Sequence, residues 1–474
     1  MGKILFDTKV QFIKYKVLKE VVKYAYEGTL LENIMDIPEK VIVGKKATIR
    51  CCVYKERHIV RERIKRAVSG VKLGENVISV IRSACDDCPS SGYTVTADCR
   101  GCLAHRCKLA CPKKAISFDE NLQAVIDKSL CINCGLCAKA CPYSAIKNRI
   151  RPCVNACKVN AISVNEDGSA RIDDEKCITC GQCVYQCPFG AITDRSSLVQ
   201  IIEQLKNEDK HVYAIVAPAI GSQFDYAKIG QVITGIKKLG FYQVIEAALG
   251  ADMVAYSETQ ELVEKGFLTS SCCPAFVAYI KKYFPEVADK VSHNPSPMVA
   301  VSKFLKEQDP KAVTVFIGPC TAKKREALED ETHSIDFVMT FEELQAAFSG
   351  RDIIVDELEE TSLDNASYFG RIFARLGGLT EAVGQVIKEN NIDFEVKPVM
   401  CEGIENIKPY LARIKFGKID FNFLEGMACM GGCIGGPCNI THEIRDRATI
   451  DKFGQTSSLK TVQESIDNAE NNLK

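Results

Sequence analysis

The sequence predicts an α/β domain in the second half of the chain, preceded by cysteine-rich α+β modules and a small N-terminal α/β segment. Sixteen of the 25 cysteines lie between residues 81 and 195, in repeated CxxC and CxxxCP spacings. Beyond about residue 200, apolar strand-like runs alternate with amphipathic helical runs, as in α/β layers. Five further cysteines stand in three stretches that are rich in Gly, Pro and small polar residues.

The composition is that of a globular protein with about three domains. The chain has 474 residues, 46% of them hydrophobic, and Lys plus Arg balances Asp plus Glu at 61 each, which favours no nucleic-acid partner. The opening stretch MGKILFDTKVQFIKYKV lacks the apolar core of a signal peptide. The most apolar run, VYAIVAPAI, is about half as long as a membrane span. We therefore expect a soluble, cytoplasmic protein with no membrane partner.

The N-terminal segment, residues 1–80, combines helical and extended patterns. Apolar residues recur at helical spacing over 10–34, with an end expected near Gly28. Residues 39–70 predict one or two strands and then a basic amphipathic helix, whose charged face is more typical of a solvated surface than of a docking site. Adjacent cysteines cannot easily bind one cubane together, so Cys51 and Cys52 are expected to be structural thiols.

Two stretches between residues 81 and 198 match the cysteine spacing of bacterial ferredoxins in full. CINCGLCAKACP contains Cys131, Cys134, Cys137 and Cys141, and CITCGQCVYQCP contains Cys177, Cys180, Cys183 and Cys187. In this spacing CxxCxxC wraps a tight loop around three corners of a [4Fe–4S] cubane, and the fourth cysteine reaches the neighbouring cluster. The region is therefore predicted to be a repeat of ferredoxin-like half-modules.

The remaining half-modules are degenerate. CRGCLAHRCKLACP contains Cys99, Cys102, Cys107 and Cys111, with two extra residues between its second and third cysteines. His105 falls where the third ligand would normally stand, so both His105 and Cys107 are candidates; Cys107 is favoured because a loop absorbs two residues more readily than a cluster changes its electronics. Cys153 and Cys157 lack a CxxC partner of their own, which Cys85 and Cys88 can supply.

Crossed pairing of these half-modules predicts four [4Fe–4S] clusters, each bound by four of the sixteen cysteines. The predicted ligand sets are Cys99, Cys102, Cys107 and Cys141; Cys111, Cys131, Cys134 and Cys137; Cys157, Cys177, Cys180 and Cys183; and Cys85, Cys88, Cys153 and Cys187. The first three sets follow from the motif spacing. The fourth follows mainly from counting four cysteines per cluster.

Residues 199–450 are predicted to form the α/β domain, followed by a polar helical tail over 451–474. Helices are expected over 196–209 and 231–241, where apolar residues recur at helical spacing. Short apolar runs predict strands over 210–218, 242–249, 314–320 and 352–358. In such domains the loops that hold ligands follow the strand ends.

The cysteines of this domain are the candidates for a buried metal site. Cys273, Cys320, Cys429 and Cys433 stand in loops framed by Gly and Pro, where the backbone can approach a bulky inorganic ligand, and could hold one [4Fe–4S] cluster. Buried free cysteines are the alternative, but the adjacent Cys272–Cys273 pair and the GGC–GGP context favour ligation. Cys401 and Cys438 have no assigned role and are expected to be structural thiols.

Three stretches, TSSCCPAF, GPCTAKKRE and EGMACMGGCIGGP, resemble the signature motifs of the [FeFe]-hydrogenases. The similarity covers roughly residues 205–445 and is greatest to the clostridial group B subgroup. It implies an α/β catalytic domain that binds an H-cluster, which is a [4Fe–4S] cubane joined through one cysteine to a diiron centre with CO, cyanide and azadithiolate ligands. The implied activity is the reversible conversion of two protons and two electrons to H₂.

The resemblance also implies roles for single residues. Cys273, Cys320 and Cys429 would bind the cubane, Cys433 would bind it and bridge to the diiron centre, Lys323 would donate to a cyanide, and Met427, Ala217 and Pro218 would line the pocket. Protons would pass through Cys272, Glu258, Ser296 and Glu261 to solvent, with Glu326 near this network. Read without the resemblance, two Glu residues on one helix are more typical of a solvated face.

The partners implied are ferredoxin or a similar soluble electron carrier, H₂ and protons as reactants, and the maturation proteins that supply the diiron centre. Two alternatives stay open: an iron–sulfur assembly scaffold that makes no H₂, and a hydrogenase-like sensor of H₂ or redox state. Gly318 stands where the family usually has Met, and this departure keeps the sensor alternative open.

Overall fold

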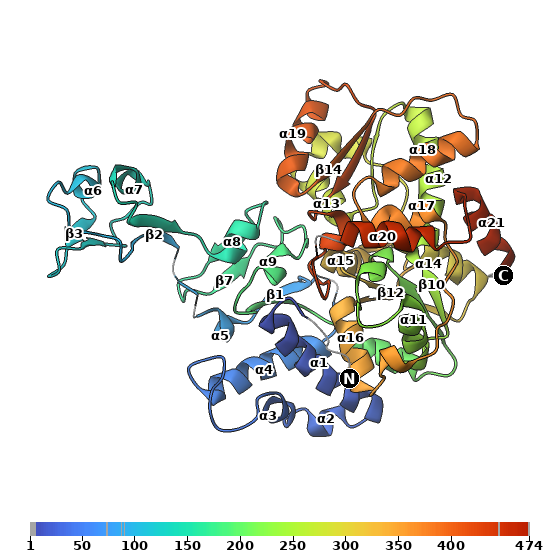
Figure 1. Cartoon of the computed structure of the whole chain (residues 1–474), viewed down its shortest axis with the longest axis horizontal. Coiled ribbons are helices and arrows are strands. Elements are labelled where there is room, and N and C mark those ends of the chain that lie inside the picture. Colours follow the sequence, from blue (N-terminus) through green and yellow to red (C-terminus); the bar gives the residue numbers. More distant parts are fainter. Residues whose placement is uncertain (1–5, 73, 87, 90, 444–445, 473–474) are drawn as a thin grey trace.

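The structure is a computed structural model that describes residues 6–72, 74–86, 88–89, 91–443 and 446–472. It consists of a helical N-terminal segment, an extended iron–sulfur region and a larger α/β body (Figure 1). None of the helices in these ranges combines the length and the apolar character that a membrane span needs.

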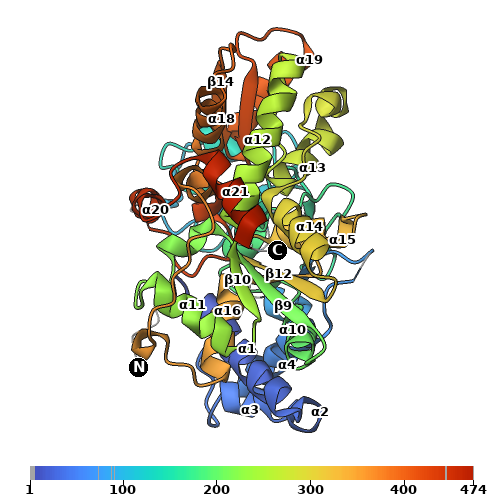
Figure 2. The ribbon, with the colours of Figure 1, turned by 90° about the vertical axis from the view of Figure 1, so that its right-hand side faces the viewer.

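The N-terminal segment consists, in its described residues, of four helices and the loops that connect them. Its helices are α1 (Lys9–Glu27), α2 (Leu30–Asn33), α3 (Ile37–Val41) and α4 (Val53–Val68). Thr8 caps the start of α1 in a capping box with Gln11, and Gly28 ends the helix with a φ of 76°, which glycine adopts without strain. The buried face of α1 packs on α16 (Phe341–Gly350) of the body, and Figure 2 shows the N-terminal helices below strands β9 (His211–Val216), β10 (Gln243–Glu246) and β12 (Ala312–Gly318).

The strands predicted between residues 39 and 53 are wrong. Helix α3 and irregular backbone occupy that stretch, and most residues from Val43 to Cys52 are exposed, so no partner strand or core face is available to an extended segment. The basic helix expected after them is confirmed as α4. Its Arg63 is buried and donates to the Gly190 carbonyl at 2.7 Å, which joins the helix to the iron–sulfur region.

The iron–sulfur region is built from two-stranded antiparallel sheets and very short helices. Its strands are β1 (Ile78–Val80), β2 (Gly92–Val95), β3 (Ile116–Phe118), β4 (Ala124–Ile126), β5 (Ile146–Arg149), β6 (Ile162–Val164), β7 (Ala170–Ile172) and β8 (Ile192–Asp194), paired as β1–β8, β2–β5, β3–β4 and β6–β7. Its helices are α5 (Arg82–Cys85), α6 (Arg106–Leu109), α7 (Leu136–Ala140), α8 (Pro152–Ala156) and α9 (Gln182–Tyr185). The module with α6 and α7 projects away from the body, and α8 and α9 lie between this module and the body (Figure 1).

The body contains two parallel sheets. The first has the order β10 (Gln243–Glu246), β9 (His211–Val216), β12 (Ala312–Gly318), β13 (Phe337–Thr340), and the second has the order β11 (Leu268–Thr269), β15 (Phe423–Met427), β14 (Pro398–Glu402). The α-helices are α10 (Leu198–Leu205), α11 (Ile229–Lys238), α12 (Ala247–Lys265), α13 (Pro274–Tyr283), α14 (Pro297–Gln308), α15 (Thr321–Glu329), α16, α17 (Tyr368–Arg371), α18 (Gly378–Glu389), α19 (Ile404–Lys415), α20 (Asp446–Gln455) and α21 (Val462–Asn472). The 3-10 helices are η1 (Pro218–Ser222), η2 (Pro285–Lys290), η3 (Val355–Glu357), η4 (Ile372–Ala374) and η5 (Gly432–Gly435).

Most predicted elements of the body are found, with one exception. Helices α10 and α11, strands β9, β10 and β12, and the helical tail all lie where the apolar patterns place them. The strand predicted over 352–358 is wrong, because Asp352 has a left-handed backbone with a φ of 53° and the stretch continues into the 3-10 helix η3.

The sheets bring the motif loops together. Strands β9 and β12 are hydrogen-bonded neighbours that run in the same direction, so the loops after Val216 and Gly318 leave the same edge of the first sheet. Strands β11 and β15 do the same in the second sheet, with Leu268 paired to Phe423. The cysteine motifs therefore follow the carboxyl ends of three strands, β11, β12 and β15.

Candidate iron–sulfur sites and proton path

A cavity at these strand ends brings the three motifs of the body together. Four of its lining residues are the cysteines predicted as ligands, Cys273, Cys320, Cys429 and Cys433. The residues predicted to line the pocket also border it, namely Ala217, Pro218, Lys323 and Met427, together with Cys272. The rest of the wall is mainly apolar and includes Phe316, Phe373 and Met298. Residues more than 200 positions apart in the chain thus face one enclosed space.

The four cysteines are close enough for their charges to interact. Burial, and then the charges of Cys273 and Cys433, raise the pKa of Cys320 to about 12. Burial, and then Cys273, raise the pKa of Cys433 to about 11. Thiolates crowded in an apolar cavity repel one another, and a bound metal cluster removes that cost because it withdraws their charge. Cys433 is accessible from the cavity itself. The donor set therefore fits a cluster bound by four cysteines.

Lys323 is a buried cation on the wall of this cavity. It lies in the first turn of α15, three residues after Cys320, and only 8% of its surface is exposed. Its Nζ contacts Glu326 Oε2 at 2.7 Å and the Cys272 carbonyl at 3.4 Å. Burial lowers its pKa, but Glu326 more than compensates, so Lys323 stays charged. A fixed positive charge beside four thiols suits an anionic ligand in the cavity.

Glu258 is the buried carboxyl group next to Cys272. Its exposed fraction is 0%, and neither carboxyl oxygen has a hydrogen-bond partner among the described residues. Burial raises the pKa of Glu258 to about 8, against smaller lowering effects from the Ser292 hydroxyl and the Ser271 backbone. Burial and then Glu258 raise the pKa of Cys272 well above its ordinary value. At neutral pH both groups therefore carry protons.

The hydroxyl between the two glutamates is Ser292, which corrects the predicted position at Ser296. Ser292 Oγ donates to Glu261 Oε2 at 3.1 Å, and the same hydroxyl lies near enough to Glu258 to lower its pKa. The Ser292 backbone N–H donates to the Thr269 carbonyl at 2.8 Å, which holds it beside the strand that leads to Cys272. Ser296 caps α14, and its hydroxyl has no hydrogen-bond partner among the described residues.

Cys272, Glu258, Ser292 and Glu261 form a row of protonatable groups, and Glu261 lies at its outer end. Its side chain, 13% exposed, contacts Lys265 Nζ at 2.7 Å and His293 Nδ1 at 2.6 Å, and it accepts from Asn294 Nδ2 at 2.9 Å. Burial would raise the pKa of Glu261, but these partners lower it on balance. The His293 side chain is 72% exposed, so the row reaches solvent here.

Phe316 explains how the cavity accommodates Gly318. Both residues lie on β12 and point to the same side, because successive strand residues alternate. A Cβ atom on Gly318 would lie 2.6 Å from Phe316 Cε1 and 3.0 Å from the Ala217 Cβ. The Phe316 ring therefore occupies the space that a side chain at 318 would need, and it forms part of the cavity wall.

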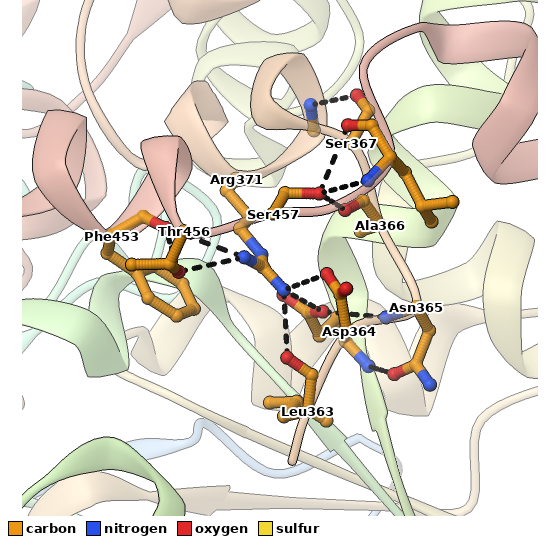
Figure 3. Close-up of polar contacts among 12 residues, drawn as sticks. Leu363, Asp364, Asn365, Ala366, Ser367, Arg371, Phe453, Thr456 and Ser457 are labelled. Carbon is orange, nitrogen blue, oxygen red and sulfur yellow. Dashed lines mark hydrogen bonds and ion pairs between the residues drawn. The ribbon is translucent and has the colours of Figure 1, made fainter.

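Helix α12, which carries Glu258 and Glu261, is fixed at its start by buried ion pairs. Arg371 contacts both carboxyl oxygens of Glu246, the residue before α12, at 2.7 and 2.8 Å. Figure 3 shows Arg371 among Asp364, the Leu363 carbonyl and Thr456. Because a buried guanidinium with so many partners cannot easily move, this network sets the position of α12.

In the projecting module, two small cavities group the predicted cysteine sets. One is bordered by Cys99, Cys102, Cys107 and Cys141, and the other by Cys111, Cys131, Cys134 and Cys137. His105 does not border the first cavity; its ring stacks on Phe118 at 3.9 Å between centroids. Between the two candidates for the third ligand, the structure places Cys107 in the cavity.

The other two sets lie nearer to the body. Burial, and then Cys187, Cys85 and Cys88, raise the pKa of Cys153 to about 11, so these four thiols are neighbours. Cys183 interacts in the same way with Cys180, Cys177 and Cys157. The grouping matches the crossed pairing, including the set predicted mainly by counting. Within the described ranges, no three His, Cys, Asp or Glu side chains are placed to hold a single metal ion.

The two cysteine sets nearer to the body adjoin each other and the large cavity. Cys183 also interacts with Cys153, which links the two middle sets. Cys180 interacts with Cys273 and Cys429 of the large cavity. These two sets therefore lead to the large cavity, and the projecting module lies beyond them, in the order that Figure 1 shows for α6, α8 and α9.

Comparisons with known families agree with this architecture. Residues 210–437 match the family described as iron only hydrogenase large subunit, C-terminal domain. Residues 124–147 match a 4Fe-4S binding domain, and residues 151–191 match a 4Fe-4S dicluster domain. The predicted fold class is thereby confirmed: ferredoxin-like [4Fe–4S] modules precede a hydrogenase-like α/β domain. The predicted domain boundaries stay predictions.

Individual relatives differ in what their names state. The chain is 28% identical over 301 residues to iron hydrogenase 1 of Clostridium pasteurianum, covering 52% of each chain. It is 23% identical over 263 residues to a cytosolic Fe-S cluster assembly factor of Aedes aegypti, covering 43% of this chain and 55% of that one. The match thus spans about half the length of each relative. A solved structure of an [FeFe]-hydrogenase HydA1 variant from Chlamydomonas reinhardtii superposes with a TM-score of 0.49 at 22% identity, over 58% of this chain and 94% of that chain.

Proposed function

We propose that the protein is a hydrogenase of the [FeFe] type, which interconverts H₂ with two protons and two electrons at an H-cluster. One observation carries the proposal. A row of protonatable groups, Cys272, Glu258, Ser292 and Glu261, leads from the cysteine-lined cavity to solvent. A protein that only stores or transfers clusters has no need of such a row.

The chain's own residues would perform three tasks. Cys273, Cys320, Cys429 and Cys433 would bind the H-cluster, which supplies the H₂ chemistry when bound. Lys323 would hold an anionic ligand of that cluster in place. Cys272 would give and take the proton, because its thiol borders the cavity and adjoins Glu258. The apolar wall around them would exclude bulk water.

Protons would move along side chains that can both donate and accept. A Glu258 pKa of about 8 leaves this carboxyl largely protonated at neutral pH, so it can pass a proton to Cys272 and recover one from outside. Ser292 would relay between Glu258 and Glu261, and Lys265 and His293 would keep Glu261 ionised and ready to accept. The relay in this form replaces the predicted Ser296 by Ser292.

The four cysteine sets would each hold a [4Fe–4S] cluster, and electrons would travel from cluster to cluster. The partner would be ferredoxin or a similar soluble carrier, and maturation proteins would have to deliver the diiron centre. These partners, like a cytoplasmic location, are part of the proposal. The interactions that join the two inner cysteine sets to each other and to the cavity support it.

The test is reconstitution of the protein with iron, sulfide and a synthetic diiron complex. H₂ production from a reduced dye, together with CO and cyanide infrared bands of the bound centre, would support the proposal. Absence of bands in the fully cubane-loaded protein would contradict it and favour the assembly function. Bands without turnover would favour the sensor.

Iron–sulfur cluster assembly is the second candidate, because the mosquito assembly factor shares this domain at 23% identity. An assembly factor would transfer a [4Fe–4S] cluster to an apoprotein. Transfer to an apo-aconitase, measured as recovered aconitase activity, separates the two functions. The proposed hydrogenase should give no faster recovery than free iron and sulfide.

A further inference from the structure

The projecting module ends in a surface that is both basic and apolar, here named the basic tip. It consists of Arg100, Leu103, Arg106, Lys108, Leu109, Lys113 and Lys114. Residues 99–118 contain these five Lys and Arg and no Asp or Glu. All five cations are exposed, and none forms an ion pair with a carboxylate in the described part of the chain. Leu103 is 95% exposed and Leu109 is 81% exposed.

The two leucines differ from scattered surface residues in their position. Leu103 directly follows Cys102 and lies in the two-residue expansion of the cysteine motif. Leu109 lies in α6 between Cys107 and Cys111. Because both leucines are within two residues of a cysteine that borders one of the two small cavities, anything that contacts them comes close to a predicted cluster site.

The expanded loop is held in shape. His105 has a left-handed backbone with a φ of 43°, its N–H donates to the Cys102 carbonyl at 3.3 Å, and its ring stacks on Phe118. Lys108 Nζ lies 5.9 Å from the centroid of the Phe118 ring. Arg100 and Arg106 border the cavity of Cys99, Cys102, Cys107 and Cys141. The loop therefore presents Leu103 on a fixed support, within a stretch that carries five positive charges.

This module is basic, as is the N-terminal stretch 39–70, which contains ten Lys and Arg against three Asp and Glu. Residues 91–150 contain nine Lys and Arg against four Asp and Glu, a net charge of +5, whereas the whole chain has a net charge of zero. Figure 1 shows that this module lies at the far end of the molecule, away from the body. A basic end on a neutral molecule attracts and orients acidic partners.

We propose that the basic tip is the docking surface for a small electron-carrier protein whose redox centre is surrounded by carboxylates. This inference rests on the proposed function, since it assigns the point where electrons enter. The cations would steer the carrier, and Leu103 and Leu109 would form the dry centre of the contact. In each encounter the reduced carrier would give one electron to the cluster held by the nearest cysteine set; no bond is made or broken and no proton is transferred. Two encounters supply one H₂.

The experiment uses the full chain loaded with its [4Fe–4S] clusters, and an acidic 2[4Fe–4S] ferredoxin as the probe. Affinity is measured by surface plasmon resonance, and the second-order rate constant of cluster reduction by stopped-flow absorbance, at about 0.02 M and about 0.5 M salt. The variant Lys113→Glu/Lys114→Glu removes tip charge. The matched control Lys237→Glu/Lys238→Glu reverses two adjacent exposed lysines of α11 on the body.

The tip variant should lower the rate constant at least about tenfold at low salt, and the difference should shrink at high salt. The control should stay within about twofold of the unmodified chain, a change that steering by distant charges does not exceed. Equal losses in both variants, or no loss in the tip variant, would overturn the proposal. Leu103→Ser should weaken binding about tenfold at both salt concentrations, because it removes apolar contact area. Unchanged binding by Leu103→Ser would contradict the role of Leu103 in the contact. Leu103→Met keeps an apolar side chain and should bind as tightly as the unmodified chain.

The two proposals can fail separately. H₂ formation from a reduced dye bypasses the carrier, so it tests the proposed function alone. If ferredoxin binding depends on the tip but the dye gives no H₂, the docking surface stands and the hydrogenase proposal falls. If the dye gives H₂ and ferredoxin reduces the clusters at a rate that ignores the tip, the docking proposal falls.

Discussion

Glu258 is the residue on which the proton path depends. Burial raises its pKa, and neither of its carboxyl oxygens has a hydrogen-bond partner among the described residues. An unpaired buried carboxyl group reduces stability, and proteins tend to keep one where it has a function. Its raised pKa therefore has a consequence for stability as well as for proton transfer.

Replacing Glu258 by Gln should change the pH dependence of stability. The folded pKa of about 8 lies above the ordinary value of 4.5, so the unmodified protein loses stability as the pH rises from about 4.5 to about 8. Glu258→Gln removes that loss, which amounts to at most about 5 kcal/mol at about 1.4 kcal/mol per pKa unit. The melting temperatures of the two proteins should diverge between about pH 5 and 9, with Glu258→Gln the more stable at high pH. The difference in unfolding free energy should approach the value given above. Parallel curves would contradict the raised pKa.

Ser292 and Ser296 provide a matched pair for the relay. Ser292→Ala should lower H₂ production at least about tenfold, because it removes the hydroxyl between the two glutamates. Ser296→Ala should change it by less than about twofold, since no hydrogen bond of the Ser296 hydroxyl is lost. The infrared bands of the reconstituted centre should be unchanged in both. A larger loss in Ser296→Ala would restore the path predicted from the sequence.

Gly318 and Phe316 depend on each other. Gly318→Ala should destabilise the protein by about 1–3 kcal/mol, because the new Cβ would overlap the Phe316 ring. Gly318→Ala combined with Phe316→Leu should recover most of that loss, since the smaller side chain vacates the space. Thermal unfolding of the single and double variants measures the coupling. Additive losses would show that the two side chains do not compete.

At the scale of elements, helix α12 and its anchors decide whether the relay is aligned. Glu246 before the helix and Asp252 within it are both buried, and their partners Arg371 and Ser367 come from the segment that contains α17. Asp252 accepts from Ser367 Oγ at 2.6 Å and from the Ser367 N–H at 2.8 Å. The helix is therefore held at its first two turns, while Glu258 and Glu261 follow on its later turns.

Arg371→Met should destabilise the protein by about 3–5 kcal/mol, because it leaves the Glu246 carboxylate buried without its charge partner. Arg375→Met is the control, since its partners Glu381 and Asp451 have side chains 45% and 33% exposed and can turn to water. That variant should lose only about 1 kcal/mol. Chemical unfolding of both variants measures the difference, and equal losses would contradict the role of burial.

The elements that the sequence predicts well are those with a local pattern. The CxxCxxC spacing implies the cluster loops, and the apolar runs at β9 and β12 identify buried strands, because both signals lie within a few residues. The strand expected over 352–358 is absent because Asp352 has a left-handed backbone, which the apolar pattern does not reveal. Ser292 was missed because its position depends on an isolated β-bridge between Val291 and Thr269, which are more than 20 positions apart in the chain. Its position next to His293 and Asn294 was the one available signal.

For the whole molecule, the proposed function separates the entry of electrons from the entry of protons. The cysteine sets begin at the projecting module, while the relay reaches solvent at His293 on the body. Both end at the same cavity, where Cys180 adjoins Cys429 and Cys272 adjoins Glu258. A site served by both routes is what reversible H₂ chemistry requires.

The most direct test of this account is hydrogen isotope exchange by the reconstituted protein. Incubated with H₂ in D₂O, it should form HD and D₂, because Cys272 exchanges protons between the cavity and the relay. Cys272→Ala should keep the infrared bands of the bound centre and lose exchange at least about 100-fold. Fully loaded unmodified protein that forms no HD, or a Cys272→Ala variant that exchanges at the same rate, would contradict the account.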